Sequence, residues 1–183
     1  KIVGGVAVIR VGAATEVDNY FFALFDHATD AAWLNDEDGV CGSNIICVNA
    51  LTSVTVEDGV AEGDTLSPKG WRLPLTSGEQ VVTGAITAFN VANFSTHRPA
   101  QPDEACTSSL GTATAYNLSY KDGQGTTAEF DGGGLPPTPV IGKVIIEIIN
   151  DDGTITTTTE DVCITCGGDS DGDGTSSIFE VAP

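Results

Sequence analysis

The sequence has no methionine, only two histidines, and only seven Lys and Arg residues against 26 Asp and Glu residues. The formal net charge of −19 repels phosphate backbones and anionic lipid headgroups. We therefore expect no nucleic-acid binding and no docking on acidic membranes, and cations are the natural partners of such a surface. A simpler explanation, that the acidity only keeps the protein in solution, remains open.

Long hydrophobic runs are also missing. No stretch approaches the roughly 18 consecutive apolar residues that a membrane helix requires, and no charged and then apolar leader opens the sequence. We therefore expect no membrane insertion. A chain that starts with Lys1 and has no Met is predicted to be a processed or excised piece. Its 183 residues, 40% of them hydrophobic, suffice for a core in one or two domains.

Helical periodicity is absent as well. No segment keeps apolar residues at i, i+3, i+4 and i+7 for three turns, and residues 30–34 could form one short turn at most. The short apolar period of strands predicts an all-β fold built from antiparallel hairpins. The expected strands are residues 6–11, 20–25, 53–56, 71–75, 80–94, 113–120, 140–150 and 154–164.

Turn signals separate these strands. Four Asp-Gly pairs supply the positive φ that tight turns require, and they lie at residues 38–39, 58–59, 122–123 and 152–153. The last pair predicts a hairpin between the final two strands. Residues 35–44 and 98–109 are predicted to be exposed loops. The Gly-Gly-Gly-Leu-Pro-Pro stretch at 132–137 predicts a tight connection, and not a phosphate site, because no helix or Lys-Ser/Thr pair follows it.

Five cysteines, in two close pairs and a singleton, are typical of structural disulfides in an oxidising compartment. They are Cys41, Cys47, Cys106, Cys163 and Cys166. A zinc or redox role for the last pair is the alternative. Zinc would require more ligands nearby, and a redox pair would begin a helix, whereas this pair follows a Thr-rich strand. One thiol would then be free or paired with a missing segment.

Two short stretches suggest a trypsin-like protease: Lys-Ile-Val-Gly-Gly at the start, and Gly-Asp-Ser-Asp-Gly around Ser170. The chemistry needs a histidine base next to the nucleophile and an acid that orients it. His27 has neither the neighbouring Cys nor the Ala-Ala-His-Cys context of such a base, and Asp171 would oppose the developing oxyanion. We therefore do not expect Ser170 to be a nucleophile.

The same segment has the spacing of a twelve-residue calcium loop. Oxygen ligands fall at positions 1, 3, 5, 7 and 12, namely Asp169, Asp171, Asp173, the Thr175 carbonyl and Glu180. Gly174 stands where the loop turns sharply. Because flanking helices and an apolar eighth residue are missing, the loop resembles the helix-poor Asp-x-Asp-x-Asp-Gly repeats of bacterial surface proteins more than an EF-hand. A flexible acidic linker without an ion is the alternative.

Four stretches in order along the chain resemble the C-terminal propeller of the PilY family, the tip-associated adhesins and assembly factors of type IV pili. They are residues 69–83 (KGWRLPLTSGEQVVT), 98–123 with their Pro-rich Cys loop, 132–144 (GGGLPPTPVIGKV) and 163–168 (CITCGG). Residues 8–26 are more loosely similar to an upstream blade. No Arg-Gly-Asp motif is present, and the family's calcium loop lies inside the propeller, so no specific binding residue is transferred.

The resemblance implies a partial β-propeller of about three to four blades at residues 1–162, since a blade takes roughly 40 to 50 residues. Residues 163–183 would form a cysteine motif and the calcium-type loop. It further implies a non-enzymatic, extracellular, pilus-associated protein that acts in pilus biogenesis and surface attachment. Its partners would be the remainder of the parent adhesin or minor pilins, and a host or abiotic surface.

Two alternatives differ in class. The chain could be a structural subunit of, or decoration on, an extracellular filament that assembles by strand pairing at open edges. It could also be a hydrolase that uses paired carboxylates such as Glu129 and Asp131, two acids at i and i+2 that share a face if both lie on one strand. This spacing is common on solvated surfaces, which favours a non-enzymatic role.

Overall fold

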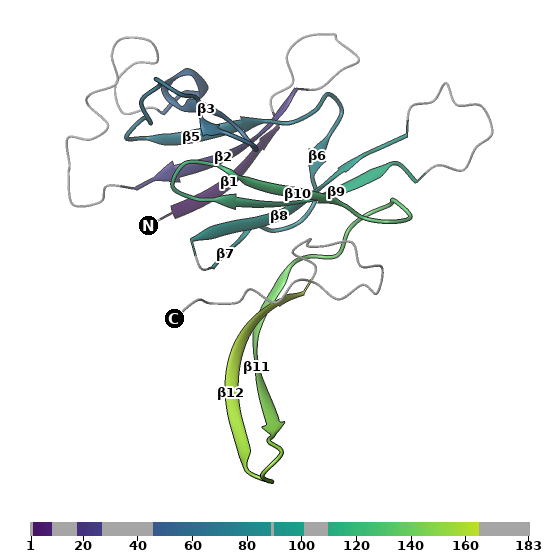
Figure 1. The fold of residues 1–183 in the computed structure, drawn as a ribbon. Helices are drawn as coiled ribbons and strands as arrows, with labels where there is room; N and C mark the ends of the chain where they lie inside the picture. Colours follow the sequence, from purple (N-terminus) through teal and green to yellow (C-terminus); the bar gives the residue numbers. More distant parts are fainter. Residues whose placement is uncertain (1, 9–17, 27–45, 89, 101–109, 165–183) are drawn as a thin grey trace.

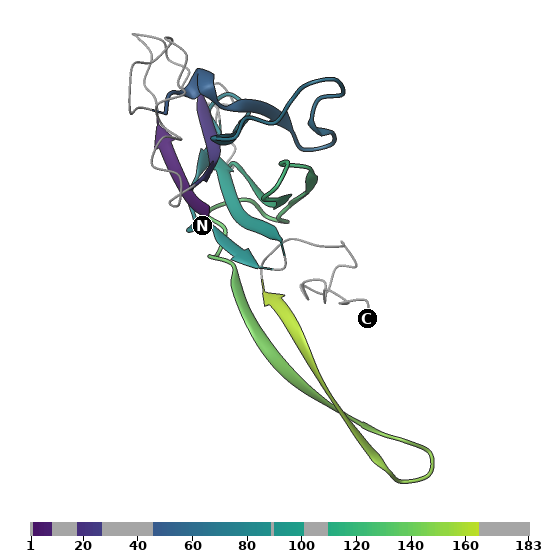
Figure 2. The same cartoon turned by 90° about the vertical axis from the view of Figure 1, so that its left-hand side faces the viewer.

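The computed structural model describes residues 2–8, 18–26, 46–88, 90–100 and 110–164. Within them the chain forms twelve strands and one short 3-10 helix, Val48–Ala50. Two sheets lie face to face, and a long two-stranded ribbon projects away from them (Figures 1 and 2). The prediction of an all-β chain is confirmed. No helix of the described part is long and apolar enough to cross a membrane.

The first sheet has the order β1-β2-β5-β3-β4. Its strands are β1 (Ile2–Val8), β2 (Asn19–Phe25), β5 (Gly70–Pro74), β3 (Thr52–Thr55) and β4 (Gly59–Val60). One pair departs from the predicted antiparallel hairpins, because β3 pairs with β5 in parallel. Parallel pairing needs a connection of about a dozen residues or more to return the chain to the same end, and residues 56–69 supply it.

The second sheet has the order β10-β9-β8-β6, and β7 also pairs with β8. Its strands are β6 (Gln80–Val81), β7 (Ile86–Ala88), β8 (Val91–Arg98), β9 (Thr112–Ser119) and β10 (Gly125–Glu129). The single strand predicted at 80–94 is therefore three strands. The chain reverses before β8 at Asn90, whose φ of 67° lies in the left-handed region that Asn tolerates. The short strands β4 and β10 follow predicted Asp-Gly turns but were not themselves predicted.

Aromatic side chains from both sheets fill the space between them. The Phe21 ring on β2 stacks on the Phe94 ring on β8, with centroids 3.8 Å apart, and Phe94 stacks on Tyr116 of β9 at 4.9 Å. Trp71 on β5 is completely buried beside Phe21. Because alternate residues of a strand point to one face, these residues form the inner layers of two stacked sheets.

Two hydrogen bonds tie the sheets together at one edge of this core. The Trp71 indole Nε1 donates to the Tyr120 carbonyl at 2.9 Å, and the Gly125 N–H donates to the Val56 carbonyl at 2.8 Å. The buried indole N–H therefore has its polar partner on the opposite sheet.

The ribbon consists of β11 (Val140–Ile149) and β12 (Ile155–Ile164), paired antiparallel without a bulge. This hairpin was predicted, and its turn is closed by a hydrogen bond from the Gly153 N–H to the Asn150 carbonyl. The predicted Asp-Gly turns at 58–59, 122–123 and 152–153 all have glycine at positive φ (66°, 78° and 79°). The tight connection at 132–137 is confirmed by three successive glycines at positive φ.

Several predictions fall on residues that the structure does not describe. These are the helical turn at 30–34, the loop at 35–44, the Asp38-Gly39 turn, most of the loop at 98–109, and the chain after residue 164. The loop was predicted to start at Arg98, which is instead the last residue of β8. The predicted division between residues 162 and 163 lies within β12.

Candidate interaction surface

Aliphatic side chains are unusually exposed along β11. Val140, Ile145 and Ile149 are 55%, 69% and 76% exposed, and Ile155 at the start of β12 is 62% exposed. Seven of the ten residues of β11 are Val or Ile. Such a nearly continuous run is typical of a strand covered on both faces, and contiguous exposed apolar surface marks interaction sites. The ribbon is therefore the best candidate for a binding surface among the described residues.

The two faces of β11 differ in chemistry. Successive side chains of a strand point to opposite faces. One face carries only aliphatic side chains and a glycine, from Val140, Gly142, Val144, Ile146 and Ile148. The other alternates isoleucine with charge, from Ile141, Lys143, Ile145, Glu147 and Ile149. Across from β11, the exposed residues Thr156 to Thr159 line the middle of β12 on both faces.

The long edges of the ribbon are open within the described part of the chain, where β11 and β12 pair only with each other. An open edge presents unpaired N–H and C=O groups that can accept a further strand. Charged residues usually protect such edges, and here Lys143 and Glu147 are the charges on β11.

The tip of the ribbon is held by side chains. The Asn150 Nδ2 donates to the hydroxyls of Thr154 and Thr156, each at 2.9 Å. The Thr154 hydroxyl and N–H donate to Asp152 Oδ1 at 2.6 and 2.9 Å. These two hydrogen bonds hold the pKa of the Asp152 carboxyl below its usual value, because they stabilise the charged form. The ordered turn fixes the register of the strands that it joins.

The base of the ribbon carries a disulfide-bonded cysteine. Cys163 near the end of β12 is 3% exposed and disulfide-bonded, and Cys47 is also disulfide-bonded. Structural disulfides were predicted for both, while a zinc-ligand role for Cys163 is excluded because zinc binds a thiolate. Cys163 lies in a strand and not at a helix start, which disfavours the redox motif. Pro139, directly before β11, is fully buried.

A second candidate, a buried cluster of hydrogen bonds around one carboxylate, was missed by sequence reasoning. Glu79 is 5% exposed and its carboxylate accepts hydrogen bonds from the Tyr116 hydroxyl at 2.8 Å, the Thr76 N–H at 3.0 Å and the Thr96 hydroxyl. Burial, and then the Glu79 carboxylate, raise the pKa of Tyr116. All donors come from the chain itself and the group faces the interior. The arrangement therefore anchors the turn before β6 to the second sheet rather than serving a substrate.

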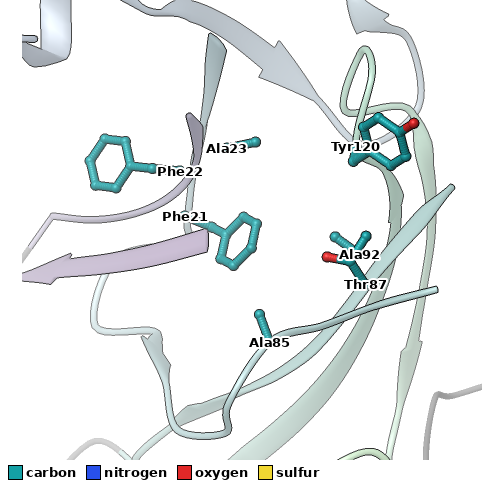
Figure 3. Close-up of a pocket in the computed structure, with 7 residues that line it drawn as sticks. All are labelled: Phe21, Phe22, Ala23, Ala85, Thr87, Ala92 and Tyr120. Carbon is teal, nitrogen blue, oxygen red and sulfur yellow. The ribbon is translucent and has the colours of Figure 1, made fainter. Parts of the chain in front are cut away.

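A small pocket lies between the two sheets near β7 (Figure 3). Its volume is about 160 Å³, and its lining is Phe21, Phe22, Ala23, Ala85, Thr87, Ala92 and Tyr120. The lining contains no carboxylate, histidine or lysine, so it offers no acid–base pair for catalysis. It is too small for a typical ligand site, which takes roughly 300 Å³ or more.

The predicted calcium ligands Asp169, Asp171, Asp173, Thr175 and Glu180 all lie outside the described residues, as do Ser170 and His27. Within the described part, no three His, Cys, Asp or Glu side chains come together as a metal site would require. The carboxylate pair suggested for a hydrolase does not share a strand, because Glu129 ends β10 and Asp131 lies in the following turn. Both are exposed.

The aliphatic run of β11 could have been singled out from the sequence, whereas its exposure could not. Valine and isoleucine occupy both odd and even positions between the Gly-rich connection and the Asp-Gly turn, so both faces of the strand carry aliphatic side chains. No protein-family model matches the chain, and no curated protein or solved structure is significantly similar to it.

Proposed function

We propose that this chain is a non-enzymatic, extracellular interaction module that resembles the propeller of a PilY-type pilus tip adhesin. It would act in pilus biogenesis and in attachment to a host or abiotic surface, and bind minor pilins or the remainder of its parent adhesin. The exposed aliphatic ribbon carries this proposal, because a surface of that kind is suited to protein contacts and has no evident catalytic use.

The stretch with the Lys-Gly-Trp and Ser-Gly-Glu motifs supports the proposal through its structural roles. Gly70 has a φ of 122°, and a Cβ atom there would lie 1.9 Å from the Ala23 carbonyl oxygen. Trp71 fills the centre of the core and Glu79 anchors the turn before β6. These motif residues are thus framework positions, as expected if the resemblance reflects a common fold.

The described sheets form no closed propeller, and the partial propeller is part of this proposal. Neighbouring propeller blades are small antiparallel sheets that pack face to face. The two stacked sheets would be successive blades and the ribbon would begin a third, within the three to four blades that we infer.

The calcium part of the proposal concerns Asp169, Asp171, Asp173, Thr175 and Glu180. Their alternating oxygen ligands match the six to eight oxygens that Ca²⁺ takes, and the net charge of −19 would favour cation binding. Bound calcium would order the segment after β12.

Calcium binding is tested by isothermal titration calorimetry on the purified chain. We expect binding heat for the unmodified protein and none for a D169N/D171N/D173N variant. A variant with the exposed acids Glu57 and Glu62 changed to Gln is the matched control. The absence of heat with the unmodified chain would refute the calcium assignment without bearing on the adhesin role.

The adhesin role is tested in cells of the source organism that lack the chain. We expect fewer surface pili in electron micrographs and weaker attachment, both restored by the unmodified gene. We also expect surface-applied protease to digest the chain on intact cells. Normal piliation and attachment, or protection from protease, would contradict the proposal.

A filament subunit that assembles by strand pairing is the second candidate. The open edges of the ribbon favour it, because edges that are not blocked can add strands indefinitely. Fibres of the purified chain in electron micrographs would support this alternative over the adhesin role.

A further inference from the structure

The open edge of β11 carries a specific set of residues. The Asn150 N–H donates to the Thr154 carbonyl across the hairpin at 2.9 Å, and the ribbon has no bulge. In an antiparallel pair, alternate residues point their N–H and C=O groups toward the neighbouring strand. Even-numbered residues of β11 therefore bond to β12. The odd-numbered residues, from Ile141 to Ile149, present their N–H and C=O groups at the open edge.

These edge residues form a pattern that is complementary to itself. Read forward they are Ile141, Lys143, Ile145, Glu147 and Ile149. Read backward, the order of apolar residues is the same and the two charges exchange sign. A strand with this pattern can pair antiparallel with an identical strand so that every charge faces its opposite.

We propose that β11 is a self-association edge that pairs antiparallel with β11 of a second copy of this chain. The two-fold axis passes between the two Ile145 residues. Each Lys143 lies opposite Glu147 of the second copy, and each Ile141 lies opposite Ile149. The two hairpins together form one four-stranded sheet.

The backbone supports the same register. When two antiparallel strands pair, the residues that point their N–H and C=O groups at the partner strand lie directly opposite each other. The two residues of each such pair exchange both N–H···O hydrogen bonds. The axis at Ile145 places odd residues opposite odd residues, as this rule requires. Side chains of opposite residues then share one face, so the charges of the two copies meet on the same side of the sheet.

Other registers are less favourable. A slip of two residues places both Lys143 and Glu147 opposite isoleucine, and a slip of four places either two lysines or two glutamates opposite each other. Like charges directly across a sheet are destabilising. Within each hairpin Lys143 is also opposite Asp161.

Net charge limits the strength of this association. Two chains of −19 repel each other, and salt screens that repulsion within about 8 Å at physiological ionic strength. We therefore expect the dimer to tighten between low and moderate salt.

The competing arrangement is an open filament in which β11 adds to β12 of the next copy. If β11 paired with β12 of the next copy in the register that the two strands have within the hairpin, Lys143 would lie opposite Asp161 and Glu147 opposite Thr157. The filament would bring one pair of oppositely charged residues together at each contact and would continue without closing. The two-fold dimer brings two such pairs together and is closed.

Charge reversal separates the two arrangements. In the two-fold dimer, E147K places Lys opposite Lys twice, so dimerisation measured by sedimentation equilibrium should weaken by about tenfold or more. K143E should do the same, and a mixture of the two variants should form a heterodimer because every charge again faces its opposite. In the filament, E147K faces Thr157 and association should persist. The matched control is T158K, which lies opposite Ile146 with its side chain on the other face of the ribbon.

Hydrogen exchange tests the unmodified protein independently of any variant. The N–H groups of Lys143, Ile145 and Glu147 should exchange more slowly as protein concentration rises, while those of Thr157 and Thr159 on the β12 edge should not. A chain that stays monomeric at millimolar concentration and moderate salt, one that forms fibres, or an E147K variant that still dimerises would overturn the proposal. None of these results depends on the pilus assignment, because purified protein alone is measured.

Discussion

The hydroxyl of Tyr116 on β9 donates a 2.8 Å hydrogen bond to the carboxylate of Glu79, which lies just before β6. The same oxygen accepts from the Thr96 hydroxyl on β8, and the other carboxylate oxygen accepts from the Thr76 N–H. A charged group at 5% exposure is stable only when its hydrogen-bonding capacity is met in this way.

We predict that Glu79→Gln lowers the free energy of unfolding by about 1–3 kcal/mol, because the amide cannot accept all three hydrogen bonds as a carboxylate does. Chemical denaturation measures the change. Glu62→Gln, at an exposed position, is the control and should stay within about 0.5 kcal/mol of the unmodified protein. If the two variants are equally stable, the cluster does not anchor the turn.

Coupling between the two residues is tested by a double-mutant cycle. Tyr116→Phe removes one hydrogen-bond donor from the Glu79 carboxylate. The resulting loss in the free energy of unfolding should be smaller in the Glu79→Gln background than in the unmodified protein. Additive losses would show that the hydrogen bond contributes nothing measurable.

We predict that stability falls at alkaline pH through Tyr116. Its pKa is raised in the folded chain, first by burial and then by Glu79, whereas an unfolded Tyr ionises near pH 10. Above that pH the unfolded chain loses a proton that the folded chain retains, so the free energy of unfolding drops by up to about 1.4 kcal/mol per pH unit. The contribution is complete below about pH 10.

Urea denaturation from about pH 8 to about pH 11 measures this slope. Tyr116→Phe should show a shallower decline than the unmodified protein. Tyr120→Phe is the control, because it removes a tyrosine hydroxyl from a partly exposed side chain. Parallel pH dependences for the unmodified protein and Tyr116→Phe would contradict the prediction.

We predict that Gly70→Ala is strongly destabilising. The position combines a φ of 122° with a Cβ position only 1.9 Å from the Ala23 carbonyl oxygen, so the β2–β5 pair would have to separate. Gly63→Ala is the matched control, since its φ is 90° but nothing lies within 4 Å of a Cβ there. It should cost about 1–3 kcal/mol from backbone strain alone. Equal losses in thermal or chemical denaturation would show that the close approach is unimportant.

We predict that Phe94→Ala lowers the free energy of unfolding by about 3–5 kcal/mol. The ring is 1% exposed and stacks on one ring from each sheet, Phe21 and Tyr116, so its removal leaves a cavity between the sheets. Leu135→Ala, at a side chain that is 76% exposed, should change stability little. A loss below about 1 kcal/mol for Phe94→Ala would contradict the central place of this stack.

Local signals account for most of what could be predicted. Alternating apolar residues depend only on the period of a strand, and positive φ at an Asp-Gly turn depends only on the missing Cβ of glycine. For this reason the hairpin of β11 and β12 was predicted almost residue by residue. The division of residues 80–94 into three strands was not, because the reversal at Asn90 carries only a weak signal.

Contacts between segments that lie far apart in the chain could not be predicted from the sequence. The parallel pairing of β3 with β5 depends on where residues 56–69 carry the chain, and the Glu79 cluster joins residues 17 and 37 positions apart. In both cases contacts between distant segments outweigh local preference.

The sequence by itself determined the strand-rich class, the turns, the strong acidity and the aliphatic run of β11, because each depends on residues close together in the chain. Only the tertiary structure decided which apolar side chains are covered. Phe21 and Phe94 meet across two sheets, whereas Ile145 and Ile149 remain on a ribbon that extends beyond them. Burial depends on what packs against a strand, and no local pattern contains that information.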